Sequence, residues 1–194
     1  MPTHSSELRI SVYGHPSAQP ESVADLFGAT YNTDAEGSEE VAIFVINPNT
    51  GVDEKTVSNW VALDEFQTPR LIVVTNLESG EADFDDAVLL ANRLFDQIVT
   101  PYLVLHDDAG APCALISLET QEITDYTSSP STVIPSEAEH KTLVSEFVEE
   151  YRSHMAVMGE GSFAAGLLFP AIPVWIEKNL GVDIVKQYLA EINR

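Results

Sequence analysis

The sequence predicts an α/β fold built mainly on a parallel β-sheet. Two runs of apolar and largely β-branched residues, Val41–Ile46 and Leu71–Val74, flank a stretch whose apolar residues recur at helical spacing. Strands that are apolar along their whole length are typical of parallel sheets, because helices cover both faces of such sheets. A strand–loop–helix pattern over residues 8–29 precedes this unit. The 194 residues suffice for one α/β domain that carries an insertion.

The first elements alternate between strand and helix. Leu8–Tyr13 predicts the first strand. Glu21–Ala29 predicts a helix, with Pro20 suited to its first position. The polar connection Thr30–Glu40 then leads to the strand at Val41–Ile46.

Two longer helical patterns follow the turn at residues 47–51. The first is Thr56–Phe66, and its predicted core face consists of Val57, Trp60, Val61 and Leu63. The second is Ala82–Val99, whose apolar residues at helical spacing are Phe84, Val88, Ala91, Leu94, Phe95 and Ile98. Its first turn is acidic, which complements the helix dipole and explains these aspartates better than a carboxylate site does: Asp83, Asp85 and Asp86.

The pattern changes after residue 100. Tyr102–Leu105, Ala114–Ser117 and residues 122–126 predict a small antiparallel unit. Thr127–Pro135 predicts a loop, and it ends at Ser136, which we expect to cap a helix over Glu137–Val157. Leu167–Val174 predicts a strand in spite of two prolines, and Val182–Ile192 the last helix. We therefore predict one compact unit with a core of residues 1–100 and 167–194 and an inserted α+β subdomain over residues 101–166.

The composition is strongly acidic. Thirty-one acidic residues stand against 9 basic ones, which gives a net charge of −22. This charge repels nucleic-acid phosphate and anionic membranes, so we expect neither as a direct partner. A well-solvated surface is the simplest explanation of this acidity, and a basic protein partner is the more specific one. The sequence begins without a signal-like pattern and has no apolar run of about 18 residues, so we expect a soluble, cytoplasmic protein.

Metal and cofactor chemistry has little support in the sequence. Cys113 is the only cysteine, which excludes an intramolecular disulfide and a cysteine-based metal site. The five histidines are scattered without ligand spacing: His4, His15, His106, His140 and His154. No serine has the context of a nucleophile elbow. We therefore expect no metal and no cofactor.

Several strings, in the same order along the chain, resemble the GTP-binding domain of elongation factor G and its divergent bacterial elongation-factor-G-like paralogues. Residues 45–60 resemble V-V-D-A-x-x-G-V-x-x-x-T-x-x-x-W, Pro69–Val74 resembles P-R-I-V-V-V, and Ala82–Val88 resembles A-D-F-D-x-x-V. Weaker likenesses continue over residues 101–126 and 161–183. The resemblance implies a truncated fold of the P-loop NTPase type, a three-layer sandwich with a small α+β insertion.

The phosphate-binding motif of that family is altered here. The motif G-x-x-x-x-G-K-[ST] supplies backbone amides, a lysine and a hydroxyl to phosphate and magnesium. Aligned on Gly14 and His15, the sequence has Gln19 in place of the second glycine, Pro20 in place of the lysine and Glu21 in place of the hydroxyl. A cation and an amide donor are lost, and a carboxylate is gained.

The guanine-binding motif is altered as well. The N-K-x-D motif falls on residues 75–78, where Thr75 and Asn76 replace the first two residues and Glu78 replaces the aspartate. Trp175 lies near the loop that supports the base in the family and is bulky enough to fill its pocket. About ten residues join the first helix to Val41, too few for the family's first switch and its D-x-x-G magnesium loop.

The resemblance and these departures together predict a non-catalytic pseudo-GTPase, a protein-interaction or regulatory module related to translation factors. The alternative is an enzyme or small-molecule binder that uses the remodelled pocket, where Glu21 and Glu78 would favour a cationic or hydroxyl-rich ligand. Residual GTP binding without hydrolysis is a third hypothesis. Loss of the strands that normally flank the first one would expose Leu8–Tyr13 as an edge, which we expect to be covered by a second copy in a homodimer or by the N-terminal tail.

Overall fold

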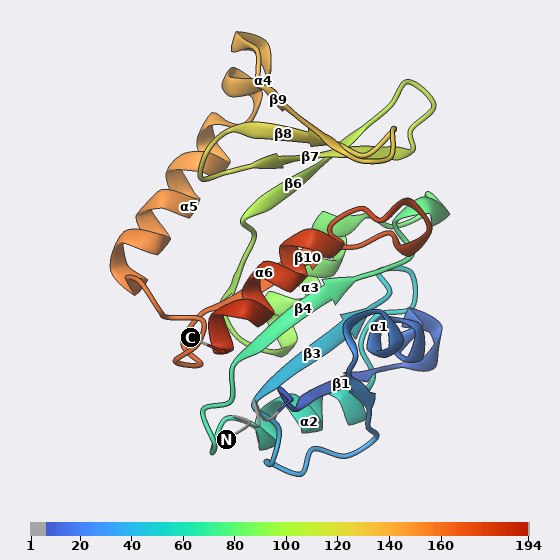
Figure 1. The fold of residues 1–194 in the computed structure, drawn as a ribbon, viewed down its shortest axis with the longest axis vertical. Helices are drawn as coiled ribbons and strands as arrows, with labels where there is room; N and C mark the ends of the chain where they lie inside the picture. The colour runs from blue at the N-terminus through green and yellow to red at the C-terminus, as the bar shows by residue number, and fades with distance from the viewer. Residues whose placement is uncertain (1–6, 194) are drawn as a thin grey trace, which may run out of the picture.

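The computed structural model describes residues 7–193, so the N-terminal tail proposed to cover the first strand lies largely outside the described residues. The chain forms two β-sheets (Figure 1). The larger has the strand order β2-β1-β3-β4-β10-β5, and every pairing in it is parallel. Its strands are β1 (Ile10–Gly14), β2 (Thr30–Tyr31), β3 (Val41–Ile46), β4 (Arg70–Val74), β5 (Ile98–Val99) and β10 (Phe169–Pro173). The predicted α/β fold with a mainly parallel sheet is confirmed.

Helices cover both faces of this sheet. The helices α1 and α6 together line a cavity on one face, while α2 and α3 lie on the other (Figure 1). The helical elements of this part are η1 (Pro16–Ala18), α1 (Pro20–Phe27), α2 (Glu54–Ala62), η2 (Leu77–Ser79), α3 (Phe84–Leu94), η3 (Ile176–Lys178) and α6 (Val182–Ile192). Both central strands β3 and β4 are buried along their whole length, as their apolar sequences require.

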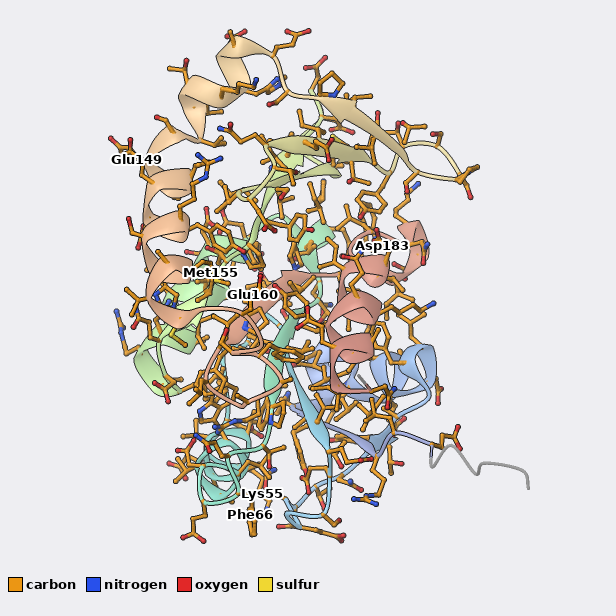
Figure 2. All side chains as sticks on the ribbon, turned by 60° about the vertical axis from the view of Figure 1, so that its left-hand side comes forward. Lys55, Phe66, Glu149, Met155, Glu160 and Asp183 are labelled. Carbon is orange, nitrogen blue, oxygen red and sulfur yellow. The ribbon has the colours of Figure 1, made fainter. Side chains whose placement is uncertain are left out.

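The smaller sheet is antiparallel and belongs to the inserted segment. Its order is β6-β7-β8-β9, with β6 (Tyr102–His106), β7 (Pro112–Ser117), β8 (Glu122–Asp125) and β9 (Thr132–Pro135). Two helices follow it, α4 (Ala138–Leu143) and α5 (Ser145–Met158), and α5 packs Val148 against Ile116 and Ile123. The Tyr126 hydroxyl donates to Asp183 Oδ1 at 2.9 Å, which joins the end of β8 to the first turn of α6 (Asp183 is labelled in Figure 2).

A cationic side chain lies in the core of the larger part. Arg70 is almost fully buried, with its guanidinium 4.5 Å from the centre of the Trp60 ring and 4.7 Å from that of Phe169. It donates to the carbonyls of Trp60 and Thr68 and forms an ion pair with Asp64. Stacking, hydrogen bonds and a counter-ion together make the burial of this charge tolerable.

The strand β10 is central although it contains two prolines. Val174 N donates to Val74 O, so the even-numbered amides of β10 point toward β4 and the odd-numbered ones toward β5. Pairing with β4 begins only at Ala171, and pairing with β5 ends at Pro170. An N–H group at Pro170 would point toward β4, and one at Pro173 would point toward β5. In each case the neighbouring strand is not paired with β10 at that position, so the sheet loses no hydrogen bond.

The structure corrects the prediction that β1 is an uncovered edge. The two-residue strand β2 lies outside it, pairing Thr30 with Ser11 and Tyr31 with Val12. Asn32 N also donates to Val12 O at 3.0 Å. The connection predicted as polar and irregular thus supplies the missing neighbour, and a homodimer through Leu8–Tyr13 would have to displace it.

Other differences concern where elements end. The helix predicted over Ala82–Val99 stops at Leu94, and residues 98–99 join the sheet as β5. The loop predicted at 127–135 contains β9. The helix predicted at Glu137–Val157 is divided at Val144, and Glu137 rather than Ser136 occupies its N-cap. Within residues 7–193, no helix is both long and apolar enough to cross a membrane.

Candidate functional site

The loop aligned with the phosphate-binding motif is folded onto itself. Ala18 N donates to His15 O at 2.9 Å and Gln19 N to Pro16 O at 3.1 Å, while Ser17 N donates to His15 Nδ1 at 3.2 Å. Pro16 and Pro20 have no N–H group. Every backbone amide from residue 16 to residue 20 is therefore either absent or bonded within the loop.

Neighbouring loops hold this segment in place. Asn47 Nδ2 donates to Ser17 O at 3.0 Å, and Thr75 Oγ1 donates to Ala18 O at 2.7 Å. The hydroxyls of Ser17 and Thr50 lie 2.8 Å apart. These bonds connect the loop after β1 to the loops after β3 and β4, so its conformation is set by three segments of the chain.

The residues aligned with the phosphate-binding motif shape the start of α1 and the turn before it. A Cβ on Gly14 would lie 2.7 Å from Val45 O, so this glycine allows β1 and β3 to approach closely. His15 caps η1, and Pro20 is the first residue of α1. Gln19 has a left-handed backbone (φ 62°), and Glu21 is exposed in the first turn of α1.

The segment aligned with the guanine-binding motif follows β4 directly. Thr75 is buried and bonded to Ala18, Asn76 has a left-handed backbone (φ 56°), and Glu78 is exposed in η2. Glu21 lines a cavity beside the loop, and Glu78 is not among the residues that line it. Of the two carboxylates that the sequence suggested as a joint ligand site, this cavity therefore contains one.

A different pair of carboxylates lines the cavity beside the loop. This cavity of about 470 Å³ contains Glu21 and Glu177, together with Gln19, Pro20, Tyr31 and Ile176 on its walls. None of its lining residues is a lysine or arginine. Trp175, predicted to fill the base pocket, is half-buried, its backbone pairs with Leu180, and Lys178 Nζ lies 5.8 Å from its ring centre.

Sequence reasoning missed most of the residues that close the loop. Asn47 and Thr50 were read only as a turn, and Tyr31 and Glu177 were not considered. A turn that carries three side-chain amides or hydroxyls directly after a buried strand is the signal that could have identified Asn47, Asn49 and Thr50.

A second surface feature is a groove between α3 and α5, called here the α3–α5 groove. Two adjoining cavities of about 590 and 190 Å³ form it, and they share Asp85, Leu103 and Phe147. The side chain of Leu89 is 66% exposed and that of Phe147 is 46% exposed, so apolar surface faces solvent along it. Glu149, by contrast, lies on the outer side of α5 and points away from the body of the molecule (Figure 2).

The groove has acidic walls. Asp85 and Glu150 line it, and Asp83 lines its smaller part. Burial, assisted by the neighbouring charges of Asp83 and Asp86, raises the pKa of Asp85 above its ordinary value, while His106 acts in the opposite direction. The described residues contain no group of three or more histidine, cysteine or acidic side chains arranged to hold a metal ion.

Sequence comparison finds proteins of the kind that the motifs resemble, elongation factor G-like proteins. Two elongation factor G-like proteins of Mycobacterium tuberculosis, from strains CDC 1551 / Oshkosh and ATCC 25618 / H37Rv, are each 27% identical over 166 residues, which covers 73% of this chain. The match covers 22% of the relatives, so the chain spans about a fifth of their length. No family model matches the chain.

The fold is shared with a solved structure. A crystal structure of a protein from Thermus thermophilus superimposes with a TM-score of 0.69 at 19% identity, over 80% of this chain and 27% of that one. The resemblance to elongation factor G-like proteins is thus confirmed in sequence, and the fold is shared with a solved structure.

Proposed function

We propose that this chain, related in sequence to elongation factor G-like proteins, is a pseudo-GTPase domain that neither binds nor hydrolyses GTP and acts through contact with another protein. The observation that carries the proposal is the closed loop after β1, in which residues 16–20 offer no backbone amide to a ligand. A role close to translation is proposed from the relation alone.

The argument against nucleotide binding is electrostatic and geometric. Phosphate binding at such a loop depends on backbone amides that point at the anion and on a lysine. Here the amides of residues 17–19 are used internally, Pro20 stands at the lysine position, and Glu21 places a negative charge at the adjacent hydroxyl position. Losing one charged hydrogen bond costs about 1.5–3 kcal/mol, and several are lost together.

Equilibrium binding of fluorescent GDP and GTP, with and without magnesium, tests this part of the proposal. We expect no saturable binding up to high micromolar nucleotide, with the fold verified by circular dichroism on the same sample. Magnesium-dependent binding at micromolar concentration would contradict the proposal and require a hydrolysis assay.

The interaction surface that we propose is the α3–α5 groove. Its exposed apolar floor and acidic walls match an amphipathic helix with apolar residues on one side and lysine or arginine along its edges. The chain's net charge of −22 would speed the approach of such a basic partner. A cation beside Asp85 would also stabilise the carboxylate whose pKa is raised by burial.

A designed peptide provides the probe. We would measure, by fluorescence anisotropy, the binding of a 16-residue helical peptide with leucines on one face and lysines on the other, against a scrambled peptide of the same composition. Phe147→Asp should weaken binding at least tenfold, because it places a charge on the groove floor. Val157→Asp is the matched control on the same helix, since Val157 is 85% exposed and lies outside the groove.

The outcomes separate a specific groove from general charge attraction. Binding that weakens with salt, is lost in Phe147→Asp and is kept within twofold in Val157→Asp supports the assignment. Equal binding of the scrambled peptide, or equal loss in both variants, would refute it.

The second candidate function uses the cavity beside the loop. Its volume of about 470 Å³ and its two carboxylates, Glu21 and Glu177, favour a small cationic or hydroxyl-rich ligand over a phosphate. A thermal-shift screen of amines and sugars tests this, with Glu177→Gln expected to abolish any shift and the exposed Glu122→Gln to leave it unchanged.

A further inference from the structure

The strand β6 forms one edge of the smaller sheet (Figure 1), and no other strand of residues 7–193 pairs with its outer side. Leu118 N donates to Pro101 O at 2.9 Å, so these residues form a hydrogen-bonded pair of the β6–β7 ladder. Bonded and non-bonded pairs alternate along an antiparallel ladder, and Asp107 N again donates to the chain entering β7. The backbone N–H and C=O groups of Val104 and His106 therefore point outward, away from β7.

The smaller cavity of the α3–α5 groove runs along this outer side of β6. Its walls include four consecutive residues of the strand, 103–106. Successive side chains point to opposite faces of a sheet, and here Leu103 and Leu105 pack in the cluster shared with α5 while Val104 packs against the main core. A cavity that contacts residues of both faces lies along the edge of the strand, beside the outward backbone groups.

The other walls of this cavity are apolar and acidic. The apolar wall includes Leu143 of α4, whose side chain is 72% exposed, and Phe147 of α5. The start of α3 contributes Asp83 and Asp85. None of the residues that line the cavity is a lysine or arginine. Backbone groups without a partner strand, exposed apolar surface and negative charge therefore occur together at this place.

The opposite edge of the smaller sheet is less suited to pairing. Tyr126 N donates to Cys113 O at 2.9 Å, and the same alternation directs the backbone groups of Val133 and Pro135 outward from β9. Pro135 has no N–H group, and proline at an edge strand is one way in which proteins prevent pairing with another chain. The outward positions of β6 carry no proline, so β6 is the better template for a further strand.

We propose that the smaller cavity of the groove binds an extended segment of the protein partner, which adds to β6 as a further strand. A polypeptide backbone matches donors and acceptors that recur every two residues, as those of Val104 and His106 do. Apolar residues of the segment would contact Leu143 and Phe147, and alternating lysines or arginines would be attracted by Asp85. The net charge of −22 opposes pairing with a second copy of this chain. This inference rests on the proposed function, because it concerns the same partner and groove.

A hexapeptide of alternating valine and lysine, acetylated and amidated, tests the proposal on the unmodified protein. By NMR, it should slow amide hydrogen exchange of Val104 and His106 at least tenfold and change that of Leu105, whose amide faces β7, less than twofold. Two further versions carry N-methyl groups on the valines or on the lysines, whose amides point to opposite sides of an extended chain. One version should lose at least tenfold in affinity, and the other should bind within threefold of the parent peptide.

Variants of the protein identify the edge and the cavity. Val104→Pro removes an outward N–H without removing a bond to β7, and it should weaken hexapeptide binding at least tenfold. Val133→Pro, at an outward position of β9, is the matched control and should leave binding within twofold. Leu143→Lys changes only the smaller cavity and should weaken hexapeptide binding at least fivefold, whereas Leu89→Lys changes only the larger one and should weaken the helical peptide instead. Circular dichroism verifies the fold of each variant.

The outcomes separate this inference from the proposed function. If the helical peptide binds as proposed but the hexapeptide protects neither Val104 nor His106, strand addition is wrong and the proposed function stands. Equal loss with both methylated versions, or hexapeptide binding that Val104→Pro leaves unchanged, would also refute strand addition. Protection of these amides that rises with protein concentration alone would assign the edge to a second copy and overturn the proposal. Absence of binding by both peptides would contradict the inference together with the proposed function.

Discussion

At the residue scale, Arg70 combines several roles in one buried side chain. Its guanidinium lies over the adjoining rings of Trp60 and Phe169 and donates to two carbonyl groups, while its ion-pair partner Asp64 is half exposed. The contacts with the rings and the carbonyls are shielded from water, whereas the contact with Asp64 is screened by solvent. The stabilisation should therefore come from the buried contacts rather than from the ion pair.

Substitutions at both positions test this division. Arg70→Met should lower the free energy of unfolding by about 2–4 kcal/mol, because it removes the guanidinium donor of the Thr68 carbonyl and leaves the Trp60 carbonyl with only the amide of Leu63. Asp64→Asn should change it by about 1 kcal/mol or less. Urea denaturation measures both, and a larger loss for Asp64→Asn than for Arg70→Met would show that the ion pair dominates.

Burial was predicted correctly from the sequence for apolar side chains whose only role is to pack in the core. Trp60 and Leu63 are buried as their spacing predicts, but Val61, predicted on the same face, is 57% exposed. Asn59 is buried in its place, since its side chain accepts from Ala35 N and donates to Thr33 O. An apolar pattern gives no information about a polar residue that is buried because a distant loop supplies its hydrogen bonds.

At the element scale, the turn before α6 depends on a glycine. Gly181 has φ 76°, and a Cβ built on it would lie 1.9 Å from Pro173 O. Gly80, at the end of η2, has nearly the same backbone angle (φ 77°) but no heavy atom within 4 Å of its Cβ position. The two positions separate the cost of the backbone conformation from the cost of a clash.

We expect Gly80→Ala to cost about 1–2 kcal/mol, the strain of a left-handed alanine. Gly181→Ala should cost several kcal/mol more, since β10 or α6 must shift to relieve the contact with a backbone oxygen. Thermal denaturation of the two variants provides the comparison. Equal losses would mean that the start of α6 moves freely.

Element boundaries depended on contacts that the local sequence does not contain. The helix α3 ends at Leu94 because Phe95 leaves helical geometry and Asn92 Oδ1 accepts from Ile98 N, which directs residues 98–99 to β10. The strands β2 and β9 are short and lie in segments that were predicted as connections, and only their partners β1 and β8 make them strands. The starts of helices with capping residues and the extents of fully apolar strands, by contrast, were predicted within a few residues.

At the scale of the whole molecule, buried phenols link stability to alkaline pH. Burial raises the pKa of five described tyrosines: Tyr13, Tyr102, Tyr126, Tyr151 and Tyr188. Above pH 10 the unfolded chain releases these protons while the folded chain retains them, so the folded state binds more protons. Stability is therefore complete below the unfolded pKa and is lost as the pH rises toward the folded values.

Between pH 10 and 11 each of these tyrosines should lower the free energy of unfolding by up to about 1.4 kcal/mol. Urea denaturation at pH 8, 9, 10 and 11 measures this decline, and absorbance at 295 nm reports the ionisation. Tyr188→Phe should make the decline less steep, because it removes one of the protons. A free energy of unfolding that stays constant or rises up to pH 11 would be incompatible with this picture.

The fold class and the altered nucleotide motifs were predictable from the sequence, but the shape of the site was not. Gln19, Pro20 and Glu21 showed that a lysine and a glycine were missing. The closure of the loop depends on Asn47 and Thr75, which come from other strands. Likewise, the pairing of Glu21 with Glu177 in one cavity follows from tertiary structure alone.

The pairing of β5 with β10 has a consequence for how this gene could change over evolutionary time. The chain leaves the large sheet at Val99 and returns at Phe169, and Phe169 and Pro170 pair with Ile98 and Val99 in the same ladder. The segment between Val99 and Phe169 therefore begins and ends at neighbouring positions, which the pairing of β5 with β10 holds together. Codons can be added or removed there without separating the strands on either side, so this junction is where the lineage could acquire, reshape or discard a module while the sheet persisted.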